Sequence, residues 1–226
     1  MRTRRWRVLM LDSGPTPREF PALEVFRRFG AGGTDADALS VGAAGHGTRI
    51  ASIICRARPE PELGVAQVLD GRGHATADDV AAALRWATEL QPDLVHMSLG
   101  LTADRPAISA AIDALVRAGV VCVASAPARG APVFPAACPG VIAASGDARC
   151  GPDEIAVLAP NVAQFGGCAV LRDAAGREWR GASIGAAHVT RCIVGELEPG
   201  TPVAVIRGEL AALARFPGPE RRARKA

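Results

Sequence analysis

The sequence predicts an α/β protein in three layers, with helices covering both faces of a doubly wound, mostly parallel sheet. Apolar runs of strand length alternate along the chain with longer segments of helical period, and this alternation is typical of parallel sheets. The apolar runs are continuous rather than interrupted at every second position, which indicates strands buried on both faces. Both observations favour the same architecture.

The expected elements follow one another along most of the chain. Strands are expected at 6–11, 64–69, 94–98, 120–124, 141–145 and 154–158. Helices are expected at 46–55, 77–90, 105–118 and 183–195. The second of these helices has the clearest ends, because Thr76 is a good cap before an acidic first turn and Pro92 stops the helix. Two short runs at 168–171 and 178–180 are expected to form a β-hairpin.

The length of 226 residues fits one domain with a sizeable core. We expect this domain to cover 1–216 and to be followed by a basic, disordered tail at 217–226. The formal charge of +3 is small, and much of the excess lies in arginine runs at the two ends. Without a basic stripe or an aromatic stacking platform, no nucleic-acid partner is expected. No segment has the roughly 18 apolar residues of a membrane span, so no membrane partner is expected either.

Three polar residues stand at the ends or starts of these elements. Asp12 follows the apolar run 8–11, His46 opens one helix, and Ser183 opens another. Each has an ordinary alternative role: a turn aspartate, a histidine at a helix end, and a helix-capping serine. Together they supply an anion, a base and a nucleophile, and the chain order Asp, His, Ser is one of those that such triads use.

Five segments in this order resemble the subtilisin-like serine peptidases. They are 8–14, 45–53, 95–100, 133–143 and 181–189, so that the similarity runs from about residue 6 to residue 195. The resemblance implies that Ser183 attacks a peptide carbonyl, that His46 transfers the proton, and that Asp12 orients His46. It implies a structural role for His188, and Ala182, Ala186 and Ala187 replace residues that the family usually has.

The resemblance also implies a cleft in which a peptide or protein substrate binds as an added strand. One wall would be formed by Ser98, Leu99 and Gly100, and the opposite wall by the segment around Gly73. The pocket for the residue before the scissile bond would also be lined by Ser125, Ala126 and Pro127. Basic loop residues, Arg72, His74 and Arg129, would favour an acidic peptide or would simply lie in water.

One departure from the family concerns the oxyanion hole. Alignment of the run 120–130 places Ala128 where the family has an asparagine, and the only asparagine of the chain is Asn161. Losing this donor costs about 100- to 1,000-fold in turnover, a range that comes from a subtilisin itself. The backbone N–H of Ser183 would remain as a partial oxyanion hole, and Arg129 is either a substitute donor or a solvated loop residue.

These features lead to two expectations of function. The first is a cytoplasmic serine endopeptidase of narrow specificity, for example one that removes a leader from a precursor peptide. The alternative is a catalytically impaired pseudo-peptidase that binds a peptide or a partner protein, and a second protein subunit could complete the site. The cytoplasmic location is expected because the run before Asp12 is too short for a secretory signal.

Cofactors and metals are not expected. The carboxylates of Asp35 and Asp37 are near each other in sequence, but two carboxylates without further oxygen ligands are weak grounds for calcium. The six cysteines contain no Cys-x-x-Cys pair, and in a reducing compartment they are expected to be free thiols. Cys122 and Cys192 lie in apolar runs and are expected in the core.

Overall fold

The computed structural model describes residues 4–16, 20, 25–30, 45–158, 162–173 and 176–219. Its main sheet has eight strands in the order β2-β3-β1-β4-β5-β6-β8-β7. All neighbours in this sheet run parallel except β7, which pairs antiparallel with β8. The strands are β1 (Arg7–Asp12), β2 (Val25–Arg28), β3 (Glu62–Gln67), β4 (Leu94–Met97), β5 (Val121–Ser125), β6 (Ile142–Asp147), β7 (Ala156–Val157) and β8 (Phe165–Cys168). A separate antiparallel hairpin joins β9 (Val170–Arg172) to β10 (Glu178–Arg180).

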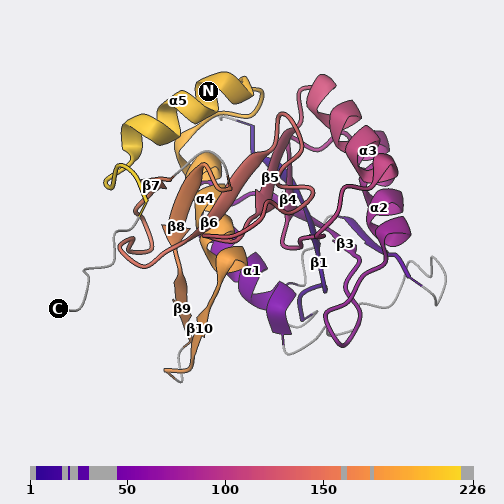
Figure 1. Ribbon diagram of the computed structural model, residues 1–226, viewed down its shortest axis with the longest axis horizontal. Coiled ribbons are helices and arrows are strands. Elements are labelled where there is room, and N and C mark those ends of the chain that lie inside the picture. Colours follow the sequence, from indigo (N-terminus) through magenta and orange to yellow (C-terminus); the bar gives the residue numbers. More distant parts are fainter. Residues whose placement is uncertain are drawn as a thin grey trace.

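Helices cover both faces of the sheet, as Figure 1 shows. The helices are α1 (His46–Ile54), α2 (Ala77–Leu90), α3 (Pro106–Arg117), α4 (Ala182–Glu196) and α5 (Val203–Leu213). One face carries α1 and α4, which pack against each other, with α5 beside α4; the other face carries α2 and α3. The predicted three-layer α/β fold is therefore confirmed.

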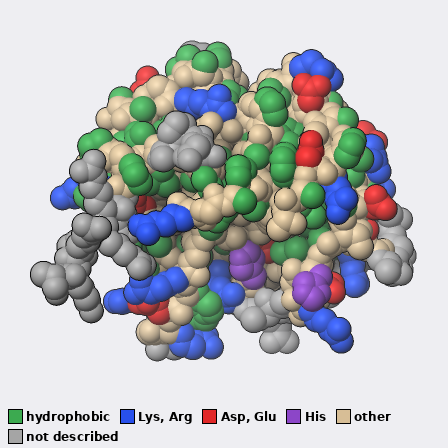
Figure 2. Space-filling model, viewed as in Figure 1, with side chains coloured by type: hydrophobic (Ala, Val, Ile, Leu, Met, Phe, Trp, Pro, Cys, Tyr) green, Lys and Arg blue, Asp and Glu red, His purple; other side chains and the backbone are tan. Residues whose placement is uncertain are grey.

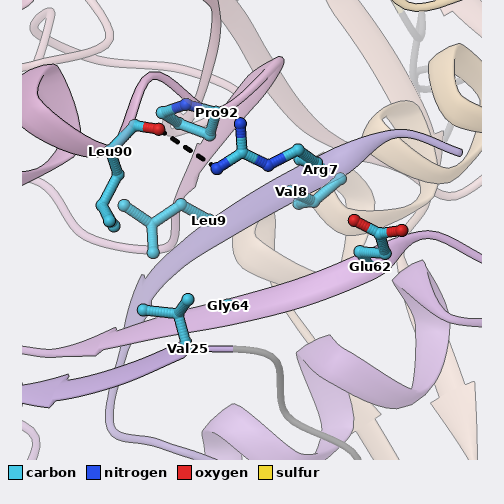
Figure 3. A pocket seen from close by; sticks show the side chains of 8 residues that line it. All are labelled: Arg7, Val8, Leu9, Val25, Glu62, Gly64, Leu90 and Pro92. Carbon is cyan, nitrogen blue, oxygen red and sulfur yellow. Dashed lines mark hydrogen bonds between the residues drawn. The ribbon is translucent and has the colours of Figure 1, made fainter.

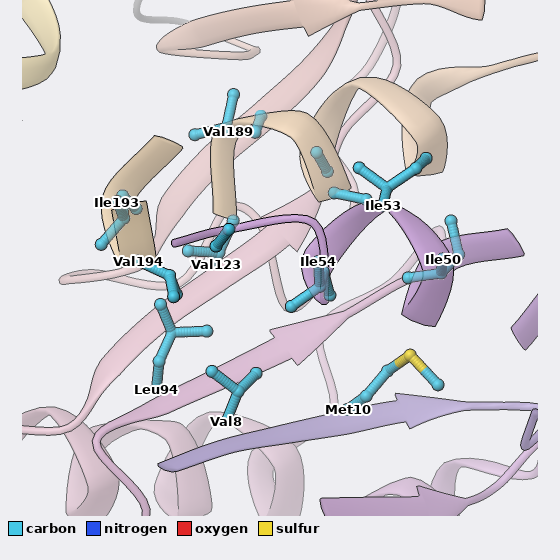
Figure 4. Packing of buried hydrophobic residues seen from close by; sticks show 14 of the residues in the cluster. Val8, Met10, Ile50, Ile53, Ile54, Leu94, Val123, Val189, Ile193 and Val194 are labelled. Carbon is cyan, nitrogen blue, oxygen red and sulfur yellow. The ribbon is translucent and has the colours of Figure 1, made fainter. Parts of the chain in front are cut away.

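The sheet separates two buried clusters of aliphatic side chains. In the cluster shown in Figure 4, Ile50, Ile53 and Ile54 of α1 and Val189 and Ile193 of α4 lie over the central strands. The opposite cluster joins α2 and α3 to the other face of the same strands. Burial on both faces explains why these strands have continuous apolar sequences. The frame also fixes the carboxyl ends of the strands, where ligands of such sheets bind.

Most expected elements are present, with α2 at the expected bounds. Three elements were missed: β2, β8 and α5. The strand expected at 154–158 is only a two-residue antiparallel edge. Cys168 ends β8 rather than starting the hairpin, which begins at Val170. The strand β8 is hard to recognise in the sequence because two of its four residues are glycines.

The end of the chain is partly held by the domain. The tail was expected from Pro217, but the carbonyl of Gly218 accepts a hydrogen bond from Arg149 at 2.7 Å, so the domain contacts the chain at least to that point. Residues 220–226 lie outside the described residues.

All six cysteines are free thiols, as expected; Cys122 is buried and Cys192 half-buried. In the described part of the chain, no helix has the length and apolar composition needed to cross a bilayer.

A small cavity of about 40 Å³ lies at the amino ends of the strands, where Arg7 begins β1 and Glu62 begins β3. Figure 3 shows the side chains that line it. An Arg7 Nη2–H donates to the carbonyl of Leu90 at 3.1 Å, which ties this edge to the end of α2. Asp12 is the last residue of β1, at the opposite end of the strand. This cavity is therefore separate from the candidate site.

Candidate active site

Asp12 and His46 are brought together where β1 ends and α1 begins. His46 Nδ1 lies 2.8 Å from Asp12 Oδ1, and the Asp12 side chain has no exposed surface while that of His46 is 32% exposed. An ionised carboxylate can only accept, so Nδ1 carries the proton and donates it to Asp12. His46 Nε2 is then left with a lone pair, which is the form that a general base requires.

Ser13 holds this pair in place. Its backbone N–H donates to Asp12 Oδ1 at 2.6 Å, and its hydroxyl donates to the same oxygen at 3.1 Å. The hydroxyl oxygen also accepts the backbone N–H of Gly47 at 3.1 Å. The helix α1 has Gly45 at its N-cap, so it has no capping side chain of its own. Ser13, which follows β1, therefore caps the N-terminus of α1 by accepting this N–H.

The close approach of β1 and α1 depends on Gly47. A Cβ at this position would lie 2.5 Å from the backbone oxygen of Gly14, which is closer than real Cβ atoms come. Gly45 has a φ of 67°, in the left-handed region that glycine adopts without strain. Gly45 thus sets the direction in which α1 begins, and Gly47 sets how closely its first turn packs against the end of β1.

Burial and charge act in opposite directions on His46. Burial lowers its pKa, but the hydrogen bond and negative charge of Asp12 outweigh burial, so the pKa is raised above 6.5. The positive charge of Arg49 partly opposes this rise. The net effect is that Asp12 stabilises the imidazolium form that a proton-accepting histidine passes through.

Ser183 is the second residue of α4, and its side chain is half-buried. The first turn of α4 sits closely on the sheet, because a Cβ at Gly185 would lie 2.2 Å from the Ser145 oxygen of β6. A Cβ at Gly167 of β8 would lie 2.5 Å from the carbonyl oxygen of Gly185. Glycines therefore seat the start of α4 against the carboxyl end of β6 and against β8.

The segments of His46 and Ser183 are neighbours. The Arg49 guanidinium lies over the Trp179 ring at 4.6 Å, with Arg49 three residues after His46 and Trp179 four before Ser183. No hydrogen bond joins Ser183 Oγ to His46 Nε2 among the described side chains. The structure thus assembles the Asp–His half of the expected triad and places the serine on a helix that packs against α1. Catalytic hydrogen bonds are often longer in unliganded enzymes.

Ala128 lies in the exposed loop that follows β5. Its methyl side chain offers no hydrogen-bond donor, and Asn161 lies outside the described residues. The backbone N–H of Ser183 is at the start of a helix, where N–H groups have no partner within the helix. The role of that N–H as an oxyanion donor stays a prediction.

A cavity of about 380 Å³ brings together four of the residues expected at the substrate cleft: Gly73, Ser98, Leu99 and Gly100. His74 also lines it, while Arg72 and Arg129 are exposed. The other three expected residues, Ser125, Ala126 and Pro127, lie at the end of β5 and do not line this cavity. Ser125 and Ala126 are buried and Pro127 is half-buried. Their role in a neighbouring pocket stays a prediction.

His96 was expected to be an ordinary strand residue and proves to be a buried link. His96 Nδ1 lies 2.8 Å from Thr190 Oγ1 of α4, and Nε2 lies 2.9 Å from Ser98 Oγ. Burial lowers its pKa to about 4, so the ring is neutral at pH 7. It connects the helix of Ser183 to the expected substrate wall. The only signal in the sequence was a polar residue inside an apolar run.

His188 is buried within α4, where its Nδ1–H donates to the carbonyl of Pro152 at 2.9 Å. Burial lowers its pKa to about 4. Within the described residues, no group of three or more His, Cys, Asp or Glu side chains is placed to hold a metal ion. Asp35 and Asp37, named above as weak calcium candidates, lie outside the described residues.

Comparison with known proteins assigns the fold and the family. The subtilase family profile matches residues 22–166. The chain belongs to the subtilase family. The matched range contains His46, whereas Asp12 and Ser183 lie outside it, so their assignment rests on the geometry described above. The solved structure of sphericase superimposes with a TM-score of 0.67 at 20% identity, covering 94% of this chain and 85% of that one. At this identity the likeness shows the fold alone.

Two curated subtilases have similar sequences. The minor extracellular protease Epr of Bacillus subtilis (strain 168) is 28% identical over an alignment of 154 positions, which covers 62% of this chain and 23% of that protein. Subtilisin DY of Bacillus licheniformis is 30% identical over an alignment of 91 positions, which covers 36% of this chain and 33% of that protein. The matched segments thus span a third or less of these relatives.

Proposed function

We propose that this subtilase is a serine endopeptidase that uses Asp12, His46 and Ser183. The observation that carries the proposal is the 2.8 Å contact between His46 Nδ1 and the fully buried carboxylate of Asp12. It fixes the ring so that Nε2 is the basic nitrogen, and it raises the pKa of His46. A buried acid aligned on a half-exposed histidine next to the helix of Ser183 is the arrangement that nucleophilic catalysis needs.

In the proposed reaction, Ser183 Oγ attacks the peptide carbonyl carbon while His46 Nε2 takes the hydroxyl proton. The negative charge on the former carbonyl oxygen is stabilised by the backbone N–H of Ser183. When the C–N bond breaks, His46 gives its proton to the leaving amine, and the acyl group stays on Ser183. Water then attacks the ester, again with His46 as base, and Ser183 is released. Asp12 stabilises the imidazolium in both halves.

We further propose that the enzyme is cytoplasmic and acts on few substrates, such as a precursor peptide that loses a leader. Six unpaired cysteines fit a reducing compartment. Ala128 in place of an asparagine would slow general proteolysis, and tight recognition of one substrate could offset that loss. The substrate would bind as an added strand beside the cavity formed by Gly73 and Ser98–Gly100.

Labelling with a fluorophosphonate tests this function, because the probe reacts with an activated serine. Intact mass should increase by one adduct, located on Ser183, and both Ser183→Ala and His46→Ala should abolish it. Arg85→Ala is the control, since Arg85 is exposed on α2, away from both cavities, and its loss should leave labelling unchanged. An unchanged mass after long exposure, with the fold confirmed by circular dichroism, would contradict the proposal.

A second candidate function is a pseudo-peptidase that binds a peptide or a partner protein without useful turnover. Two observations favour it: the side chain of Ala128 has no hydrogen-bond donor, and Ser183 Oγ makes no hydrogen bond to His46 among the described residues. In this case Ser183→Ala would bind the same partner as the wild type, and labelling would be absent or independent of His46. Slow labelling of Ser183 that depends on His46 would support the peptidase function. If labelling appears only after a second protein is added, that subunit completes the site.

A further inference from the structure

A second large cavity, of about 430 Å³, lies between the first turns of α1 and the β9–β10 hairpin. Gly45 and Thr48, on either side of His46, form its edge nearest the candidate site. The hairpin forms the other side and continues through Gly181 into the helix of Ser183. The cavity is therefore next to both the base and the nucleophile, although neither lines it.

Its lining is strongly basic. Of the described residues around it, four are arginines, and Asp173 is the one carboxylate. The arginines are Arg49, Arg56, Arg172 and Arg177. Figure 2 shows Lys and Arg side chains gathered over the β9–β10 hairpin. An excess of three positive charges around one hollow attracts anionic groups.

The arginines are held in place by a shared aromatic ring and by ion pairs at the hairpin. The guanidinium groups of Arg49 and Arg177 lie 4.6 and 5.3 Å from the centroid of the Trp179 ring. Arg177 Nε also donates to Asp173 at 2.7 Å, and Arg172 Nε donates to Glu178 at 2.9 Å. Stacking on an aromatic face leaves the edge of a guanidinium able to bind a carboxylate.

The two large cavities are lined from different layers of the protein. The cavity of Gly73 and Ser98–Gly100 adjoins the layer of α2, because Val80 of that helix lines it. The arginine-lined cavity adjoins α1, in the layer on the other face of the sheet. If an extended peptide runs from one cavity to the other, it passes the segments that carry His46 and Ser183. If residues before the scissile bond lie along Ser98–Gly100, residues after it reach the arginines.

We propose that the arginine-lined cavity binds acidic side chains of the substrate segment that follows the scissile bond. This inference rests on the proposed peptidase function for the direction of the peptide. Arginine is well suited to the task, because its planar donors match a carboxylate. The residues involved differ from the loop residues Arg72, His74 and Arg129, which lie elsewhere on the surface or at the other cavity.

The test measures binding without cleavage, in the Ser183→Ala background. Three fluorescein-labelled octapeptides share the same apolar residues and differ in one half: four glutamates in the second half, four glutamines there, or four glutamates in the first half. Fluorescence polarisation at low salt gives each Kd. The peptide with glutamates in the second half should bind most tightly, and its advantage over the glutamine peptide should fall with salt.

Two substitutions test the arginines directly. Arg172→Gln and Arg177→Gln should each weaken binding of that peptide by up to about fivefold, the factor of an exposed ion pair. Their side chains are 71% and 72% exposed, so both variants should fold. Arg180→Gln is the matched control, because Arg180 is on the same hairpin but does not line the cavity.

Equal binding of the glutamate and glutamine peptides would overturn the inference. So would equal losses in Arg177→Gln and Arg180→Gln, or tightest binding of the peptide with glutamates in its first half. The outcome is separable from that of the function. If the protein prefers the glutamate peptide but is not labelled by a fluorophosphonate, the acidic binding site is supported and the peptidase function is contradicted. If it is labelled but shows no preference, the peptidase function is supported and the acidic binding site is contradicted.

Discussion

The backbone N–H of Gly47 donates to Ser13 Oγ at 3.1 Å, so the end of β1 holds the first turn of α1. The same hydroxyl donates to Asp12 Oδ1. One buried side chain thus connects the expected acid to the helix of the expected base. The distance between Asp12 and His46 is set by this connection as well as by their own hydrogen bond.

Ser13→Ala should therefore weaken both the fold and the site. The variant leaves the buried N–H of Gly47 without a partner, which costs about 1–3 kcal/mol in the free energy of unfolding. Labelling of Ser183 by a fluorophosphonate should also slow, because His46 loses its fixed position. Urea unfolding and the labelling rate measure the two effects. Thr88→Ala is the control, because it removes a hydroxyl hydrogen bond within α2. If Thr88→Ala slowed labelling as much as Ser13→Ala, the proposed connection between Ser13 and the position of His46 would be contradicted.

Gly47→Ala should separate α1 from β1. The new Cβ would lie 2.5 Å from the Gly14 oxygen, so the helix start must move and the protein should lose about 1–3 kcal/mol of stability. The matched variant is Gly208→Ala in α5, where a Cβ meets no atom within 4 Å. That change should stabilise the protein by up to about 1 kcal/mol. Urea midpoints that move in the same direction would show that the close approach is unimportant.

Much of the fold could be predicted because its core strands are apolar on both faces. The runs that became β1, β4, β5 and β6 have no polar alternation, and the helices between them have clear periods. The missed strand β8 contains Gly166 and Gly167, which lower strand propensity. They are there for tertiary reasons, since a Cβ at Gly167 would meet α4. Such a cause is not visible in a local window.

Of the candidate site, the sequence indicated Asp12 and His46, which the structure brings into contact, but not the residues that support them. Both were recognisable because each stands at the end or start of an element, as does Ser183, whose role stays a prediction. The roles of Ser13 and His96 depend on contacts between distant segments, with His96 and Thr190 separated by 94 positions. The arginine-lined cavity likewise joins α1 to a hairpin more than 100 positions later. Spacing within a sequence gives no direct measure of such contacts.

Ala128→Asn should restore an oxyanion donor. If the loop after β5 allows the amide to face the carbonyl oxygen, turnover of a cleavable peptide should rise by up to about 100-fold. Initial rates for the wild type and the variant measure the gain, and Ala128→Asp is a control of similar shape without the amide donor. No gain would show that Pro127 directs the loop elsewhere or that another donor already serves.

The labelling rate should depend on pH through His46. The reaction needs neutral Nε2, so the rate should rise with pH, with a midpoint above 6.5 because the folded-state pKa is raised. Arg49→Gln should move this midpoint to higher pH, since the charge of Arg49 lowers the pKa of His46. Rates across the titration measure both values. A midpoint that stays unchanged or falls in Arg49→Gln would contradict the electrostatic coupling.

The buried His96 should make the fold sensitive to acid. Its folded-state pKa is about 4 and its ordinary value is 6.5, so the unfolded chain binds a proton at higher pH than the folded chain does. The stabilisation is therefore complete above about pH 6.5 and is lost as pH falls toward 4. Between about pH 7 and about pH 5 this one group should lower the free energy of unfolding by about 2 kcal/mol.

His96→Asn separates the two contributions of this histidine. At about pH 7 the variant should be less stable than the wild type, because its shorter side chain cannot reach both Thr190 and Ser98. As pH falls to about 5 the difference should shrink, since the asparagine has no proton to gain. Urea unfolding at both values measures this, and His74→Asn, on an exposed loop, is the control. His188 also has a pKa lowered to about 4, so part of the acid sensitivity should remain. A difference that stays constant with pH would show that His96 contributes packing and hydrogen bonds but no proton linkage.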